Sequence, residues 1–463
     1  MVEIFIYLLY NYLDNKKSRC CMNIKLSDHF TYSKILRFTL PSIAMMIFSS
    51  IYGVVDGFFV SNFVGKTQFA AVNFIMPFLM ITGAFGFMFG AGGSALVSKT
   101  LGEGDSYKAN RIFSLITYAS IITGFVIALL GFIFIEPIAS FLGATGQLLE
   151  DCVVYGRIVL IALPAFMLQM EFQSFFITAE KPQLGFTVTL ASGIANMVLD
   201  WLFIAVFKLG LIGAATATGI SQLIGGVVPI IYFSTRNTSL LKLTGTSFYG
   251  KALLRTCTNG FSELLSNISM SVVGIFYNAQ LMKYEGENGV AAYGVLMYVS
   301  MIFMAIFIGY TIGTAPIIGF NYGSGNSSEL KSIRKKSIVI IGITSVAMLI
   351  LGEVLALPLS KLFAGQYPDL LSLTLRGFLI YSFSFLFSGI GIFGSGFFTA
   401  LNNGLISALI SFLRTSVLQT ATVFTLPLIF GTDGIWLSII VSDFIAAAVT
   451  VVFIIKMKKK YNY

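Results

Sequence analysis

Two acidic residues lie inside long apolar stretches of the chain, where a charged side chain needs a physical reason. Asp56 falls within the stretch 35–61, and Asp200 falls within the stretch 183–207. Burying a carboxylate in hydrocarbon is costly, so such residues usually face a water-filled cavity, pair with a partner, or carry protons or ions. Both acids are therefore candidates for chemistry.

Asn196 and Thr218 are expected to join the two acids. With a rise of about 1.5 Å per helical residue, Asp56, Asp200 and Thr218 each lie roughly 10 Å from the same membrane surface. Asn196 precedes Asp200 by one turn, on the same helix face. These four side chains offer hard oxygen ligands for a small cation such as Na+. They could equally hold a proton, because burial and a neighbouring like charge favour the neutral form of a carboxyl. A third possibility is that the acids only accept hydrogen bonds between helices.

The second half of the chain carries a different set of buried charges. Glu263 is expected near the middle of the membrane, and Arg414 could be its ionic partner, which would make both residues structural. Alternatively, the two form a polar site for a cationic substrate. Glu171 and Asp443 also lie in apolar stretches, and for both a structural role is favoured over a functional one.

The composition places these residues in a polytopic membrane protein. Of the 463 residues, 56% are hydrophobic and only 11% are charged, whereas soluble domains carry about 25% charged residues. About 20 apolar residues cross a bilayer as a helix. Twelve spans of at least this length are predicted: 35–61, 68–98, 110–135, 153–179, 183–207, 211–234, 252–282, 290–319, 333–358, 370–398, 404–430 and 434–456.

The basic residues predict that both termini lie in the cytoplasm. Cytoplasmic loops carry an excess of Lys and Arg, and most of the 29 Lys and Arg residues fall on the side of the termini. The net charge of +9 is therefore explained by membrane orientation rather than by nucleic-acid binding. Residues 1–33 are expected to form a cytoplasmic tail, with Met22 as an alternative start, and 457–463 a basic tail. The opposite side receives only Lys66, Arg157, Lys208, Lys283, Lys361 and Arg376.

An internal repeat divides the chain into two halves. A shift of 221 residues lays Ala71 on Ala292 and Gly102 on Gly323. Because each half has an even number of spans, the repeats are parallel and related by an axis along the membrane normal. We therefore predict an all-α fold with two six-helix lobes, 34–234 and 252–456, joined by a cytoplasmic linker 235–251 around a central cleft. The same shift lays Asp56 on Tyr277, so the second lobe has no copy of the acid site.

Enzyme chemistry and bound cofactors find no support in the sequence. The turn Gly102-Glu103-Gly104-Asp105 lacks the Lys-Ser/Thr pair of a phosphate-binding loop. No nucleophile lies beside a general base. The one histidine and the four cysteines do not have the spacing of a metal-binding motif. They are His29, Cys20, Cys21, Cys152 and Cys257.

An ordered set of motifs resembles the multidrug and toxic compound extrusion (MATE) transporters, in particular the efflux pumps of Gram-positive cocci. The resemblance covers about residues 25–457. It rests on the twelve spans and on Leu40-Pro41-Ser42, Val55-Asp56-Gly57-Phe58-Phe59-Val60, the Gly-Gly-Ser-Ala and Gly-Glu-Gly-Asp pair, and Asn196-Met197-Val198-Leu199-Asp200.

The resemblance implies a secondary active transporter of the bacterial plasma membrane. It would act as a monomer and export organic cations and drugs by alternating access, in exchange for H+ or Na+. In similar proteins, an aspartate of helix 1, an Asn-x-x-x-Asp of helix 5 and a threonine of helix 6 form the cation site. These correspond to Asp56, Asn196, Asp200 and Thr218, while Pro41 matches a proline at which helix 1 of some relatives bends.

The sequence leaves open whether the second lobe has a cation site and whether the protein is instead a flippase. Relatives with a second-lobe cation site pair a glutamate of helix 7 with an aspartate of helix 10, but here helix 10 has no acid and Glu263 lacks that partner. A flippase for lipid-linked oligosaccharides or lipid precursors is the alternative function. Its cleft would be expected to carry basic residues for pyrophosphate, and only Arg414 qualifies.

Overall fold

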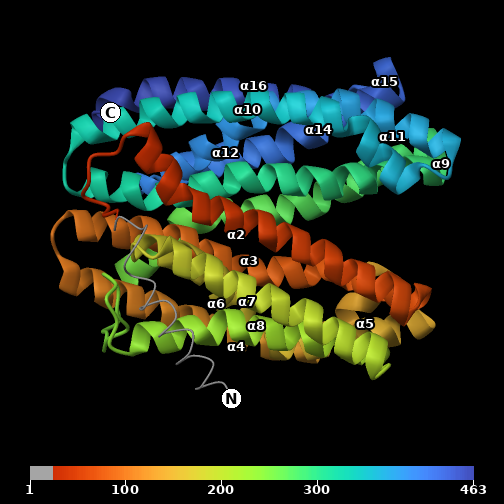
Figure 1. Cartoon of the computed structure of the whole chain (residues 1–463), viewed down its shortest axis with the longest axis horizontal. Helices are drawn as coiled ribbons and strands as arrows, with labels where there is room; N and C mark the ends of the chain where they lie inside the picture. The colour runs from red at the N-terminus through yellow and green to blue at the C-terminus, as the bar shows by residue number, and fades with distance from the viewer. Residues whose placement is uncertain (1–23) are drawn as a thin grey trace.

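The computed structural model describes residues 24–463, which fold into long helices joined by short connections. Residues 1–23, which hold most of the predicted tail and the alternative start Met22, lie outside the described residues. The N-terminal helices lie in one layer and the C-terminal helices in another (Figure 1). The first layer consists of α2 (Tyr32–Phe59), α3 (Lys66–Gly102), α4 (Ser106–Leu142), α5 (Gly146–Ile161), α6 (Leu163–Thr178), α7 (Pro182–Asp200) and α8 (Gly210–Ser234). The second consists of α9 (Gly250–Gly323), α10 (Ser327–Ala364), α11 (Pro368–Tyr381), α12 (Phe385–Ala400), α13 (Gly404–Phe412), α14 (Gln419–Thr425), α15 (Pro427–Phe430) and α16 (Thr432–Tyr461).

These helices provide the twelve predicted spans. Ten of the described helices are long and apolar enough to cross a membrane, and the bent pair α5 and α6 makes an eleventh span. Helix α9 counts twice, because its backbone leaves the helical conformation at Gly286 (φ 62°). Tyr277 and Tyr293 stack across this turn with their ring centroids 5.2 Å apart, so the two arms of α9 run side by side.

The fourth span differs from its prediction as one continuous helix over 153–179. The structure has two helices there, bent by 57° between Ile161 and Leu163. Pro164 lies in the first turn of α6. Proline has no N–H to donate within a helix and its ring clashes with the preceding turn, so α5 cannot continue unbroken into α6.

The predicted repeat is visible in matching details of the two halves. Asp105 caps α4 by accepting a hydrogen bond from the Lys108 backbone N–H (2.9 Å). At the place 221 residues later, Asn326 caps α10 by accepting from the Glu329 N–H (3.1 Å). A side-chain oxygen in this position satisfies one of the backbone donors that the first helical turn leaves free.

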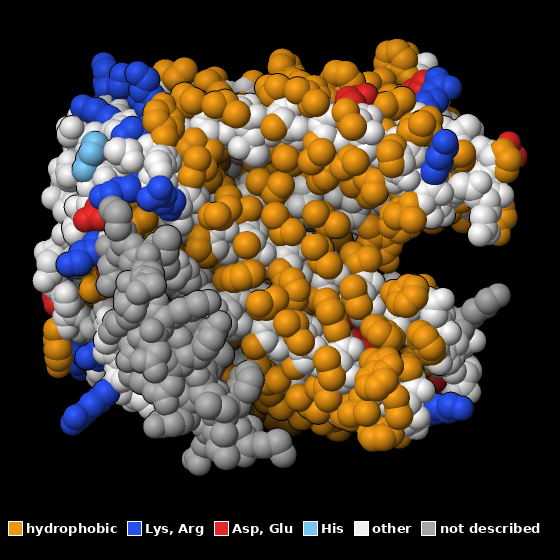
Figure 2. Space-filling model, viewed as in Figure 1, with side chains coloured by type: hydrophobic (Ala, Val, Ile, Leu, Met, Phe, Trp, Pro, Cys, Tyr) orange, Lys and Arg blue, Asp and Glu red, His pale blue; other side chains and the backbone are white. Residues whose placement is uncertain are grey.

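The two ends of the molecule differ in charge and in closure. Most Lys and Arg residues gather at one end, here called the basic end, and apolar side chains cover the middle (Figure 2). At the opposite end, here called the open end, a cleft separates the two halves (Figure 2). The cleft gives ligands access to the region between the halves from the open end (Figure 2).

Glycines close the basic end by letting backbones touch. A Cβ atom on Gly102 of α3 would lie 2.1 Å from the Phe320 carbonyl oxygen of α9, and one on Gly323 would lie 2.0 Å from the Lys99 carbonyl oxygen. The two contacts are copies of each other, since Gly102 aligns with Gly323 and Lys99 with Phe320 in the repeat. Small residues allow this close approach of membrane helices.

Candidate functional site

The structure brings Asp56 and Asp200 next to each other, although 143 residues separate them in the chain. Asp56 lies in the last turn of α2 and Asp200 ends α7. Their carboxyl groups are close enough to interact directly. Asp200 is fully buried and Asp56 is half-buried. Since α2 and α7 both end at the open end, the acid pair lies on that side of the membrane.

Irregular backbone accompanies both acids. A π-helical turn, Val60–Val64, follows α2, and another, Trp201–Val206, follows directly after Asp200. Such turns are rare, widen the helix by one residue, and are frequent at functional sites. Here they end the regular helices at the acids.

Several oxygen atoms of this group lack a hydrogen-bond partner. Within residues 24–463, Asp56 Oδ1, both carboxyl oxygens of Asp200 and Thr218 Oγ1 are buried without one. Asn196 is 2% exposed and lies one turn before Asp200 on α7. Buried polar atoms are almost always paired, so this set of acceptors fits a bound proton or a small cation.

The sequence analysis missed Tyr155, which completes the group. This tyrosine of α5 is 1% exposed, and its hydroxyl lies close to Thr218, Asp56 and Asp200. Tyr155 comes from a different helix than these three residues. No spacing along the chain identifies such a contact, because it depends on how α5 is rotated against its neighbours.

Polar side chains continue from the acids toward the middle of the first half. Tyr52, one turn before Asp56 on α2, interacts with Gln169 of α6. Gln169 Nε2 donates to Ser192 Oγ at 3.3 Å, and Ser192 donates to the Ser221 carbonyl oxygen at 2.7 Å. The only sequence signal for this extension is the spacing of four between Tyr52 and Asp56.

The second half contains a separate cluster around Arg414. This residue lies in a π-helical turn, Leu413–Leu418, and is electrostatically coupled to Glu263 of α9 and Asp443 of α16. It forms no ion pair with either acid among the described residues. Asp443 accepts a hydrogen bond from Ser388 of α12. The structure thus adds Asp443 to the predicted pair of Glu263 and Arg414.

Two further predicted residues lie outside both clusters. Glu171 is fully buried in α6 and accepts a hydrogen bond from Thr117 of α4 at 3.0 Å, a contact between helices. Pro41 lies inside α2. Before and around Pro41, α2 packs against α9, because a Cβ atom on Gly313 would lie 2.8 Å from the Thr39 side chain. Further along, Phe48 packs against Gly193 of α7 instead.

A transition-metal centre has no ligand set in the described part of the chain. Within residues 24–463, no three His, Cys, Asp or Glu side chains are grouped so that they could hold a metal ion. A monovalent cation at Asp56 and Asp200 would therefore rely on neutral oxygens, such as those of Asn196 and Thr218, for the rest of its shell.

Fold and site together define a polytopic, two-lobed membrane protein with a pair of neighbouring carboxyls in its first half, near the open end (Figure 1). The MatE family model matches the chain twice, over residues 41–202 and 264–425. The two matches correspond to the two halves of the repeat and together cover well over half of the chain. The chain therefore belongs to the MatE family, as its resemblance to MATE transporters indicated.

Individual relatives agree with this assignment over nearly their whole length. The chain is 26% identical over 430 residues to the multidrug export protein MepA of Staphylococcus haemolyticus, covering 93% of this chain and 94% of that protein. It has the fold of a MATE protein crystallised in complex with MaL6 (TM-score 0.89, 22% identity, 94% and 98% of the two chains). It also has the fold of a multidrug resistance MATE transporter in an outward-facing conformation (TM-score 0.88, 22% identity, 96% and 100%).

Proposed function

We propose that this protein is a secondary active multidrug efflux transporter, which exports organic cations in antiport with H+ or Na+ by alternating access. The observation that carries the proposal is the pair of neighbouring carboxyls, Asp56 and Asp200, with buried oxygens that lack a hydrogen-bond partner. A proton or cation bound there neutralises part of a costly buried charge. The relatives of this chain that are multidrug export proteins, the MepA proteins of Staphylococcus haemolyticus and Staphylococcus aureus, support the substrate class.

The orientation follows from the charges at the two ends. Cytoplasmic segments carry the excess of Lys and Arg, so the basic end faces the cytoplasm of a bacterial cell and the open end faces outside. The described conformation is then open to the outside. In it, an incoming H+ or Na+ reaches Asp56 and Asp200 and favours the return to the inward-open form, because it binds the two forms with different affinity.

Pro41 is the proposed hinge of this exchange. It separates a part of α2 that packs against the second half from a part that packs against α7 of the first half. Proline removes one backbone hydrogen bond of the helix. Bending at this point lets the outer part of α2, including Asp56, move with the first half while its inner part stays in contact with α9.

The acid pair is tested by transport of a cationic dye in proteoliposomes under an imposed pH or Na+ gradient. Asp56→Asn and Asp200→Asn are expected to reduce gradient-driven transport to background, because neither amide can gain or lose a proton. Asp369→Asn is the matched control, since Asp369 is an exposed acid at the open end. The coupling ion is the one whose gradient drives the wild type. Transport by Asp56→Asn at the wild-type rate and equal protein content would exclude this mechanism.

A flippase for lipid-linked sugars is less well supported. Recognition of a pyrophosphate calls for several basic side chains in the cleft. Arg414, the basic residue that the sequence places inside a membrane span, is already coupled to Glu263 and Asp443. The same proteoliposomes test this alternative through movement of a labelled anionic lipid, which is expected to be absent.

A further inference from the structure

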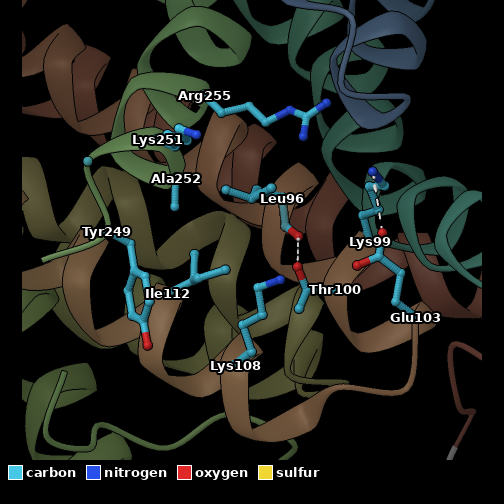
Figure 3. A pocket seen from close by; sticks show the side chains of 11 residues that line it. Leu96, Lys99, Thr100, Glu103, Lys108, Ile112, Tyr249, Lys251, Ala252 and Arg255 are labelled. Atoms are coloured by element: carbon cyan, nitrogen blue, oxygen red, sulfur yellow. Dashed lines mark hydrogen bonds and ion pairs between the residues drawn. The ribbon is translucent and has the colours of Figure 1, made fainter. Parts of the chain in front are cut away.

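A second pocket lies at the basic end, far from the acid pair. It has a volume of about 480 Å³ and lies where α3, α4 and the first turns of α9 meet. Lys99 and Glu103 approach from α3 and the turn after it, Lys108 from α4, and Lys251 and Arg255 from α9 (Figure 3). The two halves of the molecule thus share the walls of this pocket.

The charge of the pocket is strongly positive. Its lining includes four cations and one carboxylate, Glu103, which pairs with Lys99 at 3.4 Å. Among residues 24–463, the other three cations, Lys108, Lys251 and Arg255, form no ion pair. Three cations that have no ion-pair partner among the described residues give this cavity a positive potential, which attracts an anion and favours an oxyanion as its ligand.

The shape and place of the pocket suit a phosphate group. The first residues of α9, Gly250 to Ala252, form part of the wall, and no side chain among the described residues caps this helix end. The backbone N–H groups there add to the attraction that the basic side chains exert on a phosphate. Leu96, Ile112 and Ala252 provide an apolar side, against which the start of a phospholipid acyl chain can pack. Basic pockets between membrane helices on the cytoplasmic side are typical sites for anionic lipid headgroups.

We propose that this pocket binds a phosphate group, of an anionic phospholipid or of free phosphate, and that the bound group holds the basic end closed. Lys99 is part of the closing contact, since its carbonyl oxygen lies against Gly323 and its ammonium group lies 5.5 Å from the ring centre of Tyr322. Lys251 and Arg255 belong to the other half. A phosphate that contacts both sides binds more tightly when they are together, and it therefore stabilises the closed state.

The direction of this regulation rests on the proposed function. If the basic end faces the cytoplasm, the phosphate favours the form that is open to the outside and raises the cost of opening inward. An anionic inner leaflet would then set the resting conformation of the transporter before drug or coupling ion binds.

Binding is tested on the purified full-length protein in detergent by its thermal unfolding temperature. Phosphatidylglycerol is expected to raise this temperature above that in equal amounts of phosphatidylcholine. The double variant Lys251→Ala/Arg255→Ala is expected to need about 25-fold more lipid for half the effect, since each basic residue near a membrane surface contributes roughly fivefold. Lys331→Ala/Lys335→Ala, which removes two exposed basic residues of α10 at the same end, is the matched control and should behave like the wild type.

Inorganic phosphate, added without anionic lipid, separates the two sources. If millimolar phosphate raises the unfolding temperature as much as phosphatidylglycerol does, the site binds free phosphate. If only phosphatidylglycerol raises it, the site binds the lipid. Lys108→Gln, a single change at an exposed position, repeats the test if the double variant does not fold. The proposal would be overturned if phosphatidylglycerol raised the unfolding temperature of the pocket variants as it does that of the wild type. It would also be overturned if the α10 control needed as much additional lipid as the pocket variants.

Closure is measured separately by the distance between spin labels at Ser106→Cys and Ser328→Cys, two exposed positions at the basic end, in a variant without the native cysteines. Phosphatidylglycerol is expected to increase the short-distance population in the wild-type pocket and not in Lys251→Ala/Arg255→Ala. Neither measurement requires transport. If neither measurement responds to phosphate or lipid, phosphate binding is excluded while the antiport proposal is unaffected. If instead no antiport is found in proteoliposomes, the unfolding temperature and the spin-label distance still test phosphate binding.

Discussion

Individual side chains determine whether the first half can hold a cation. Asp56 and Asp200 supply the charge, while Tyr155 and Thr218 supply hydroxyl groups beside it. A carboxyl pair with unpaired oxygens would be destabilising in a purely structural setting, because buried acceptors without partners cost free energy. Of these groups, the Tyr155 hydroxyl is the one that the sequence did not place in the cation site.

Tyr155→Phe is expected to weaken coupling without loss of the fold. It removes a hydroxyl that lies close to Thr218 and to the two carboxyls, and a typical hydrogen bond contributes about 1 kcal/mol, which corresponds to roughly fivefold in ion affinity. The measurement is the gradient strength needed for half-maximal dye transport. Tyr118→Phe, a change at a tyrosine of α4 that is 42% exposed, is the control and should leave this value unchanged.

Arg414 is expected to compensate Glu263 and Asp443. Arg414→Met leaves the half-buried Glu263 and the buried Asp443 without their cation. The free energy of unfolding should fall by about 2 kcal/mol. This loss is smaller than that expected for breaking a fully buried ion pair, because Arg414 is itself half-buried. Adding Glu263→Gln should restore part of that loss. Thermal unfolding of the single and double variants forms a double-mutant cycle. Strictly additive effects would mean that Arg414 and Glu263 do not interact.

At the scale of whole helices, the contact between α3 and α9 decides which end is closed. Gly102 and Gly323 allow backbone contact at the basic end, and Gly92 allows a third contact, since its Cβ atom would lie 2.0 Å from the Thr256 carbonyl oxygen. Helices that touch through backbone atoms cannot tolerate even a methyl group without moving apart. The closed state is therefore sensitive to small changes at these glycines.

Gly323→Ala is expected to shift the conformational equilibrium away from closure of the basic end. The new methyl group would lie 2.0 Å from the Lys99 carbonyl oxygen, so α3 and α9 must separate. Spin-label distances across the basic end should lengthen. Gly342→Ala is the control, because nothing lies within 4 Å of a Cβ atom at that position of α10. Unchanged distances in Gly323→Ala would show that the glycine contact does not hold this end together.

For the whole molecule, a short segment before α2 ties the two halves together at the basic end. The Leu26 N–H donates to Glu180 of the first half at 2.6 Å, and the Phe30 N–H donates to Glu329 of α10 at 2.8 Å. Lys336 of α10 donates to the Phe30 carbonyl oxygen at 2.5 Å. This strap, residues 24–31, must detach or stretch before the basic end opens.

Docking of the strap is expected to tighten as the pH falls. Burial, together with the negative charge of Asp28 in the strap, raises the pKa of Glu180, an effect that the Leu26 N–H and the nearby Lys25 and Lys181 only partly offset. The docked form therefore takes up a proton at higher pH than the free form, whose carboxyl titrates near about 4.3. Docking is strongest below both pKa values and weakens as the pH rises through the raised one.

Hydrogen exchange of the Leu26 amide, corrected for the intrinsic effect of pH, measures this dependence. His29 of the same segment contacts Glu329 at 2.7 Å, so the comparison is made in a His29→Gln background. In that background, Glu180→Gln should abolish the pH dependence. Faster exchange at lower pH in the protein with Glu180 would contradict the expected sign.

The sequence alone determined the class of protein, its spans and its repeat. Hydrophobic length is a local property, and a helix is the form in which a single segment satisfies its backbone in lipid, so twelve spans could be predicted without knowing how they pack. The depths of Asp56 and Asp200 followed in the same way from the helical rise. The break between α5 and α6 was missed, although Pro164 marks it.

Only the tertiary structure decided which side chains meet. Tyr155 beside Thr218, Asp443 beside Arg414, and the shared walls of the basic pocket all join residues of different helices. Each of these contacts depends on the rotation and tilt of helices, which are set by packing against neighbours rather than by the apolar pattern of one segment. For the same reason, the closure of the basic end became visible only when α3 and α9 were seen in contact.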